Sequence, residues 1–179
     1  NELTKRDLLF FLDESTFKQH PLLQAKWVPK GSKEYVDTLG NHAKVNVLGA
    51  ICHAIGKTFH MKSKKLNSEI FMKFVRHLIA CNPDKHLVLV IDNAPWHKSK
   101  KTKAFLKTLK NLVDVVWLPA YSPDMNPIEH LWRFMKSLMS NHFFPEIEEM
   151  KNALTSLFKN LYSNKQKIMT LCSPDYLLG

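Results

Sequence analysis

Apolar residues along this chain fall into short unbroken runs and into longer stripes with helical spacing. Residues 8–12 and 86–91 form nearly continuous apolar runs, which are expected of strands covered on both faces of a sheet. Residues 44–53 are rich in valine and isoleucine and are predicted to form a longer strand. The region of Gly56 can turn this strand back into residues 57–61 as an antiparallel hairpin. The first third of the chain is therefore predicted to contain a three-stranded meander.

Two further short strands are predicted from the same pattern. Residues 25–28, around Trp27, can form a short strand that a turn containing proline and glycine follows. Residues 113–118 are predicted to form the last strand, which ends at Pro119 because proline cannot donate a backbone hydrogen bond.

The stripes with helical spacing predict the helices. Helix starts are expected at Ser68, Ser99, Asn126 and about Pro145. Pro127 would occupy the first helical position of the third helix, where proline is favoured. The tail from Ser163 is rich in lysine, and residues 173–175 are expected to start a last short turn.

Strands that come first, followed by alternating strands and helices, predict an α/β fold with a mixed sheet. That sheet would combine the antiparallel meander with parallel strands and carry helices on both faces. Asp13 and Asp92 each follow an apolar run, and ligands of open α/β sheets collect at the carboxyl ends of strands. The two side chains are therefore expected at one crevice if their strands are neighbours.

The composition of the 179-residue chain, 45% hydrophobic and 23% charged, is ordinary for one globular domain. The formal net charge is +10, which favours a polyanionic partner such as nucleic acid, although basic domains also bind acidic proteins. The three cysteines have no metal-ligand spacing and indicate a reducing compartment. No run is long enough to span a membrane, so a cytoplasmic location is expected.

Two segments carry unusual acidic residues. Asp92 lies in Asp-Asn-Ala-Pro-Trp-His, and Glu129 lies in Tyr-Ser-Pro-Asp-Met-Asn-Pro-Ile-Glu-His-Leu-Trp, which begins at Tyr121. Together with the run that ends at Asp13, they make the chain similar to the catalytic domain of DDE transposases of the mariner and bacterial insertion-sequence kind. The resemblance extends from about Leu8 to about Phe144. It implies an RNase H-like domain in which residues 145–179 add C-terminal helices.

The resemblance also implies an activity. Transposases of this kind cleave and transfer DNA strands at the ends of a mobile element, using two Mg²⁺ or Mn²⁺ ions. Asp13, Asp92 and Glu129 match the positions of the catalytic acids that bind these metals. DNA at the element ends and at the target would be the partner, and a homodimer or higher oligomer is expected. The location would be at the nucleoid, or in the nucleus of a eukaryote.

Each acid also has an ordinary structural interpretation. Asp13 could cap a turn, and Glu14 is an acidic rival that would point to the opposite side of the strand. Asp92 could form a local turn. Glu129 could complete a capping box with Asn126 or pair with Arg133 one helical turn later.

Further residues are candidates for roles around the site. Five residues are expected to lie next to the three acids and to support them: Glu14, Asn93, His97, Asp124 and His130. A basic face begins directly after the Asp92 segment, and its candidate DNA-binding residues are Lys98, Lys100, Lys101, Lys103 and Lys107, with Arg133 on the next helix. Packing is the simplest role for Trp96 and Trp132.

Two other functions remain open from the sequence. One is a different RNase H-like nuclease, such as a junction resolvase or an RNA:DNA hydrolase. The other is a domesticated or inactive domain that only binds nucleic acid or a partner. Members of the resembled family usually carry helix-turn-helix modules ahead of this domain, and none precedes Leu8, so the chain alone is not expected to recognise specific element ends.

Overall fold

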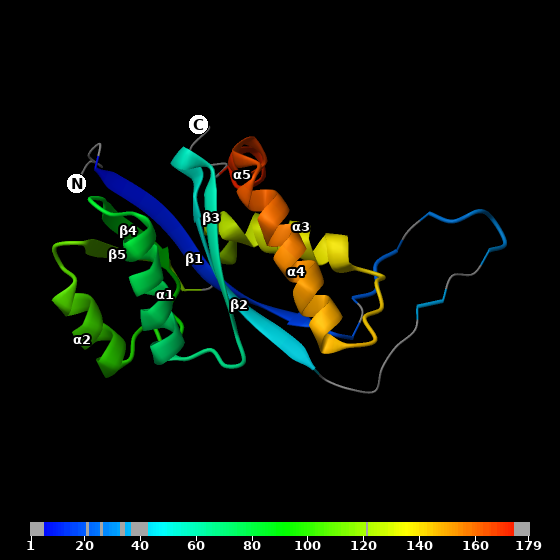
Figure 1. Ribbon diagram of the computed structural model, residues 1–179, viewed down its shortest axis with the longest axis horizontal. Helices are drawn as coiled ribbons and strands as arrows, with labels where there is room; N and C mark the ends of the chain where they lie inside the picture. Colours follow the sequence, from blue (N-terminus) through cyan, green and yellow to red (C-terminus); the bar gives the residue numbers. More distant parts are fainter. Residues whose placement is uncertain are drawn as a thin grey trace.

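A computed structural model describes residues 6–20, 22–25, 27–32, 35–36, 43–120 and 122–173. Its centre is a five-stranded sheet in the order β3-β2-β1-β4-β5 (Figure 1). The strands are β1 (Asp7–Lys18), β2 (Lys44–Cys52), β3 (Lys57–Ser63), β4 (His86–Ile91) and β5 (Val113–Trp117). β1, β2 and β3 pair antiparallel, whereas β4 is parallel to both β1 and β5. The predicted mixed sheet with an antiparallel meander is confirmed.

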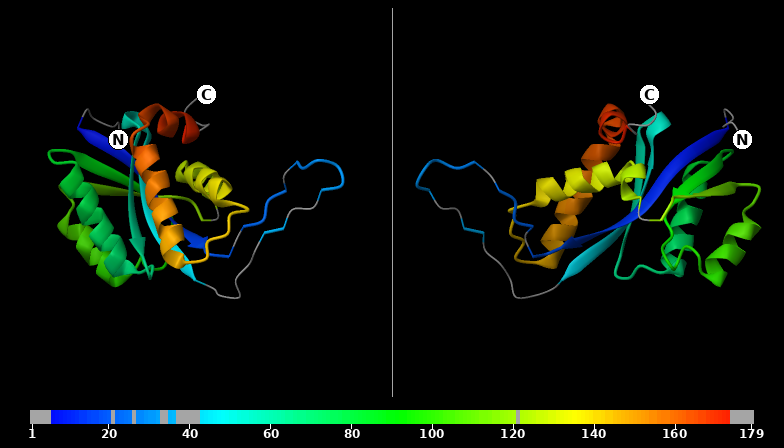
Figure 2. Two further views of the ribbon diagram at one scale, coloured as in Figure 1. Left: turned by 45° about the vertical axis from the view of Figure 1, so that its right-hand side comes forward. Right: turned by 180° about the vertical axis from the view of Figure 1, so that it is seen from behind.

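Helices cover both faces of this sheet, as predicted (Figure 2). One face packs against α1 (Ser68–Cys81) and α2 (Lys100–Thr108), and its core contains the fully buried Phe10 and Leu89. The other face packs against α3 (Ile128–Met139), α4 (Ile147–Tyr162) and α5 (Lys165–Leu171). Short 3₁₀ turns at His53–Ile55 and Pro123–Met125 complete the elements. No helix in the described part of the chain is both long and apolar enough to cross a membrane.

The structure corrects the prediction for β1, which does not end at Asp13. The strand continues to Lys18 because β2 pairs with it along its second half, from Phe11 to Lys18. The parallel pairing with β4 stops earlier, at Phe11 and Val90. Asp13 therefore lies in the middle of a strand, just beyond the point where its neighbour β4 ends.

The predicted strand at residues 25–28 is wrong. Its described residues have no regular structure, and Trp27 is fully exposed. A strand needs a neighbour to pair with, and the described residues of this segment project away from the sheet edge (Figure 1).

Three helices differ from the predictions, in a cap, in a start and in one helix that was not expected. Asn67, not Ser68, caps α1, because its side-chain oxygen accepts a hydrogen bond of 3.0 Å from the backbone N–H of Ile70. α3 begins at Ile128, two residues after the predicted start. α5 was not predicted, because its seven residues are too few to show a helical stripe. The N-cap at Ser99 is confirmed, and the turn predicted at 173–175 extends beyond the described residues.

Candidate active site

The three acids that the sequence singles out line one pocket of about 420 Å³. Asp13 comes from β1, Asp92 from the residue after β4, and Glu129 from the first turn of α3. β1 and β4 are parallel neighbours, so their carboxyl-terminal halves bring Asp13 and Asp92 to the same place. α3 packs against β1 and adds Glu129 to the same pocket.

A tryptophan holds the side chain of Asp13. The indole Nε1 of Trp132 donates a hydrogen bond of 2.9 Å to Oδ2 of Asp13. This contact depends on Gly49, the residue opposite Asp13 on β2. A Cβ atom at Gly49 would lie 2.6 Å from Cζ2 of Trp132 and 3.1 Å from Cδ1 of Ile128. Only a residue without a side chain lets the indole approach β2 this closely and reach Asp13.

The start of α3 is tied directly to β1. Asn126 is buried, and its Nδ2 donates a hydrogen bond of 3.1 Å to the backbone oxygen of Leu12, next to Asp13. Its Oδ1, the atom that would cap the helix, has no hydrogen-bond partner among the described residues, and no side chain caps the start of α3 in this part of the chain. Within the described residues, Glu129 also forms no ion pair with Arg133. Neither structural interpretation of Glu129 from the sequence is found, and its carboxylate lines the pocket instead.

Asp92 is oriented by two hydrogen bonds to one of its oxygens. Oδ1 accepts from Nδ1 of His97 at 2.8 Å and from the backbone N–H of Ala94 at 3.0 Å. The second bond forms the local turn that the sequence allowed for this residue. The hydrogen bond from His97 lowers the pKa of Asp92 below its usual value, so Asp92 is ionised at neutral pH.

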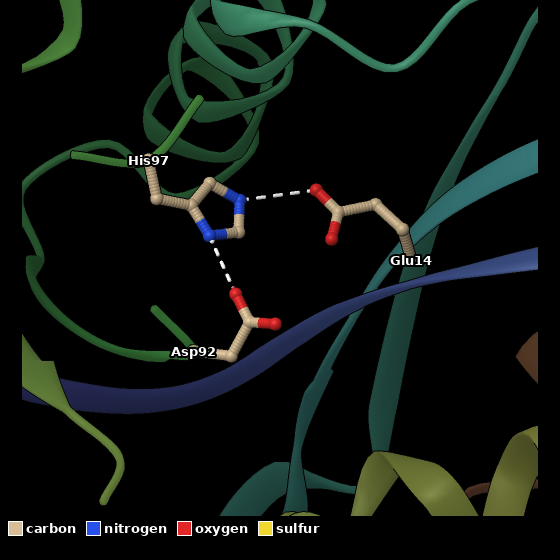
Figure 3. A group of neighbouring side chains, drawn as sticks. All are labelled: Glu14, Asp92 and His97. Carbon is tan, nitrogen blue, oxygen red and sulfur yellow. Dashed lines mark hydrogen bonds and ion pairs between the residues drawn. The ribbon is translucent and has the colours of Figure 1, made fainter. Parts of the chain in front are cut away.

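His97 joins Asp92 to Glu14 (Figure 3). Its Nε2 lies 3.0 Å from Oε1 of Glu14, and the indole Nε1 of Trp96 donates to the same oxygen at 3.1 Å. Burial lowers the pKa of His97, but the hydrogen bonds to Asp92 and Glu14 outweigh burial and raise the pKa to about 9. The ring is therefore an imidazolium that donates from both nitrogens at neutral pH.

Ligand atoms of Glu14, Asp92 and His97 all lie within 4.8 Å of one another, a spacing that could hold a metal ion. An imidazolium has no lone pair to offer a metal, however, and both nitrogens of His97 are occupied by the carboxylates. We therefore interpret this group as a buried charge bridge that orients Asp92. The bridge also shows which of the two neighbouring acids of β1 faces the pocket. Asp13 lines the pocket, whereas Glu14 points toward His97.

Asp13 has the most perturbed carboxyl group of the site. Burial is the main cause that raises its pKa from 3.8 to about 8, and the nearby carboxylates of Glu129, Glu14 and Asp92 raise it further. Carboxylates gathered in this way repel one another unless a cation lies between them. Oxygen ligands from a few acids, completed by water and phosphate, are what Mg²⁺ and Mn²⁺ prefer. The acids of this pocket therefore fit a divalent cation.

The other predicted site residues have different places. Asn93 lines the pocket, and its Nδ2 donates a hydrogen bond of 2.7 Å to the backbone oxygen of Leu118. Asp124 is exposed in the 3₁₀ turn before α3, and it does not line the pocket. His130 is half-buried on α3 and is also absent from the pocket lining.

Only some of the candidate DNA-binding residues of the predicted basic face are free of an ion pair within the described residues. Lys101 is engaged by Glu69 at 2.6 Å, whereas the exposed ammonium of Lys98 lies 5.3 Å from the ring centre of Trp117. The remaining candidates, all exposed, are Lys100, Lys103, Lys107 and Arg133. The roles of Gly49 and Trp132 could not be predicted, because a contact between a strand and a helix distant in sequence leaves no local pattern.

Comparisons with known proteins describe the family and the fold to which the chain is similar. A family model described as DDE superfamily endonuclease matches residues 8–151. An uncharacterised 39 kDa protein of insertion element IS630 from Shigella sonnei is 28% identical over 144 residues, which are 79% of this chain and 42% of that protein. The Tc3 transposase of Caenorhabditis elegans is 30% identical over 145 residues, which are 75% of this chain and 42% of the transposase. The chain thus spans less than half the length of these two relatives.

Solved structures show the same fold. The Mos1 mariner paired-end complex with Mn superimposes with a TM-score of 0.67 at 20% identity, over 93% of this chain and 53% of that one. The catalytic domain of Mos1 mariner transposase gives a TM-score of 0.60 at 17% identity, over 93% of this chain and 78% of that one. At these identities the likeness concerns the fold, which is the RNase H-like arrangement predicted from the sequence.

Proposed function

Since this chain belongs to the DDE superfamily of endonucleases, as its sequence predicted, we propose that it cleaves DNA and transfers strands at the ends of a mobile element. The observation that carries this proposal is the pocket shared by Asp13, Asp92 and Glu129. The Tc3 relative is a transposase and the IS630 relative belongs to an insertion element, which supports this activity over an unrelated nuclease.

We propose that the three acids bind two Mg²⁺ or Mn²⁺ ions. The solved Mos1 complexes with Mn and Mg support the use of a divalent metal. When bound, such ions activate a water or 3′-hydroxyl nucleophile and stabilise the attacking and leaving oxygens of a phosphodiester. The chain's own residues hold the acids in place. Trp132 orients Asp13, His97 orients Asp92, and the bond from Asn126 to Leu12 fixes the helix that carries Glu129.

The protonation states of His97, Asp92 and Asp13 indicate a different role for each residue. His97 keeps its proton at neutral pH, so it is a positioning residue and not a general base. Asp92 is ionised and ready to bind a cation. Asp13 would have to lose its proton before it could bind a cation, because its raised pKa keeps the carboxyl group protonated at neutral pH and metal ligands must be deprotonated.

The test is a nicking and strand-transfer assay with Mn²⁺ on Asp92→Asn. Asp84→Asn is the matched control, because it removes the same charge from an exposed turn where a positive φ of 61° suits asparagine. We expect Asp92→Asn to lose at least about 100-fold in rate and the control to keep full activity. Equal rates for both variants would refute the proposed site. Cutting without transfer of pre-cut ends would instead favour another RNase H-like nuclease, and binding without cutting would favour an inactive domain.

We further propose that the chain forms a homodimer or higher oligomer on DNA. The support is the segment between β1 and β2, whose described residues project from the sheet (Figure 1) and expose Leu22, Leu23, Trp27 and Tyr35. Apolar side chains gathered on one projection favour a protein contact. Sedimentation of a Leu23→Ser/Trp27→Ser variant should show the monomer where the unchanged chain associates, and an unaltered distribution would oppose the proposal.

A further inference from the structure

A second pocket lies at the far end of β1 and α3 from the acids. It has a volume of about 500 Å³, and Phe17, Leu22, Met139 and Phe144 give it an apolar floor. Around this floor lie Lys18, His20, Lys136 and His142, and none of the described residues that line the pocket is acidic. We call it the basic pocket.

Hydrogen bonds between distant segments hold the walls of the basic pocket together. The buried Gln19 donates from Nε2 to the backbone oxygens of Phe144 at 2.8 Å and Pro145 at 2.9 Å. Asn141 accepts from the backbone N–H of Gln24 and donates to the oxygen of the same residue, both at 2.9 Å. The end of β1 is thus fixed to the loop after α3, as Figure 2 shows from behind. The pocket is preformed, so a ligand need not order its walls.

A row of charges on α3 connects the two pockets. Glu129, Arg133 and Lys136 follow one another at helical spacings of four and three, so they lie on one face of the helix. Lys136 is about 10 Å along the axis from Glu129, at 1.5 Å per residue. DNA rises about 3.4 Å per nucleotide of one strand, so the row spans about three nucleotides.

β1 also runs from the acids to the basic pocket, because Asp13 lines the first pocket and Lys18 lines the second. Lys18 is about 16 Å from Asp13 at a rise of about 3.3 Å per residue, which corresponds to about five nucleotides. Lys18 also stands directly opposite Lys44 on β2. Two lysines in such a cross-strand pair repel each other, and an anion between them would remove that cost.

From this arrangement we infer that the basic pocket binds the phosphate backbone of the DNA strand whose cleaved bond lies at the acids, three to five nucleotides from that bond. The inference rests on the proposed function for the position of the cleaved bond. Lys18 and Lys136 supply the charge for the phosphates. The apolar floor faces the sugars, which offer carbon atoms and no charge.

The test is a binding titration with short pre-cut DNA, whose free end defines the position of the cleaved bond and in which single phosphates are replaced by uncharged methylphosphonates. It is carried out without metal so that no strand is cut. The unchanged chain should bind more weakly when phosphates three to five nucleotides from the cleaved bond are neutral. Lys18→Ala/Lys136→Ala should bind unmodified DNA about 5–30-fold more weakly and should be insensitive to those replacements, and its salt slope should fall by about 2. Lys85→Ala/Lys110→Ala is the matched control, because it removes two lysines from exposed positions before the amino-terminal ends of β4 and β5. This control variant should still bind more weakly when those phosphates are neutral.

Three results would overturn the inference. The first is a Lys18→Ala/Lys136→Ala variant that keeps the response to neutral phosphates. The second is a change in oligomeric state with unchanged DNA affinity, which would assign the basic pocket to a second copy of the chain. The third is an unchanged chain that does not bind DNA. A parallel cleavage assay separates the two proposals, because loss of cutting with an intact phosphate pattern refutes only the proposed activity.

Discussion

Replacing Gly49 with alanine should disturb the site from the opposite strand. The new Cβ would lie 2.6 Å from Cζ2 of Trp132, a separation that side chains do not tolerate. The indole has no free direction in which to move, because it is 1% exposed and packs edge-on against Phe17 and Phe158. The strain must therefore shift the ring or the strand.

The loss of stability in Gly49→Ala can be estimated from the cost of overpacking a protein core. An extra methyl group in a tight core costs about 1–3 kcal/mol, and each kcal/mol lowers the melting temperature of a chain of this size by about 2–4 °C. Gly49→Ala should therefore melt about 2–12 °C below the unchanged chain. A shifted indole also loses its 2.9 Å hydrogen bond to Asp13, so the affinity for Mn²⁺ should fall as well.

Calorimetric melting and Mn²⁺ titration would measure both effects. The sharpest control is the pair Gly49→Ala/Trp132→Phe, because phenylalanine lacks the atoms that the new methyl group meets. The pair should be more stable than the sum of the two single changes predicts. A single Gly49→Ala variant that melts within about 1 °C of the unchanged chain, or strictly additive costs in the pair, would refute the reasoning.

Two further predictions concern charge in the site. Because the folded pKa of Asp13 is raised from 3.8 to about 8, the folded state holds an extra proton between these values, so this group should reduce stability as the pH rises from about 4 to 8. Mn²⁺ must displace that proton, so its affinity should rise with pH up to about 8 and lose this dependence in Asp13→Asn; calorimetric titrations at pH 6, 7 and 8 that agree within error would contradict this. His97→Ala should cost about 3 kcal/mol in urea unfolding, because it leaves the carboxylate of Glu14, 8% exposed, without its cation. Glu14→Gln should recover part of that loss, and a double variant no more stable than His97→Ala would show that the bridge is not the cause.

Much of the sheet could be predicted from the sequence because buried strands leave continuous apolar runs. The run that ends at Asp92 is an example, since five of the six residues of β4 are buried. The true length of β1 could not be predicted in this way. Its second half alternates between two environments, and only the pairing with β2 makes it a strand.

The acids of the pocket could be predicted, but the groups that hold them could not. The motif around each acid is local, so Asp92 and Glu129 stand out in a single sequence. The bridge from His97 to Glu14 joins residues 83 positions apart, and the bond from Trp132 to Asp13 joins residues 119 apart. Such contacts depend on how the helices pack on the sheet, which hydrophobic periodicity does not specify.

The imidazolium between Asp92 and Glu14 makes the site asymmetric before any ligand arrives. One half of the site carries a permanent internal counterion, so its carboxylates are fixed in the resting protein at neutral pH. In the other half, Asp13 lies near the carboxylate of Glu129, and no cationic side chain among the described residues pairs with it, so a proton relieves the repulsion there. A bound cation would therefore add charge compensation mainly to the half that contains Asp13, because the half that contains Asp92 already has its own.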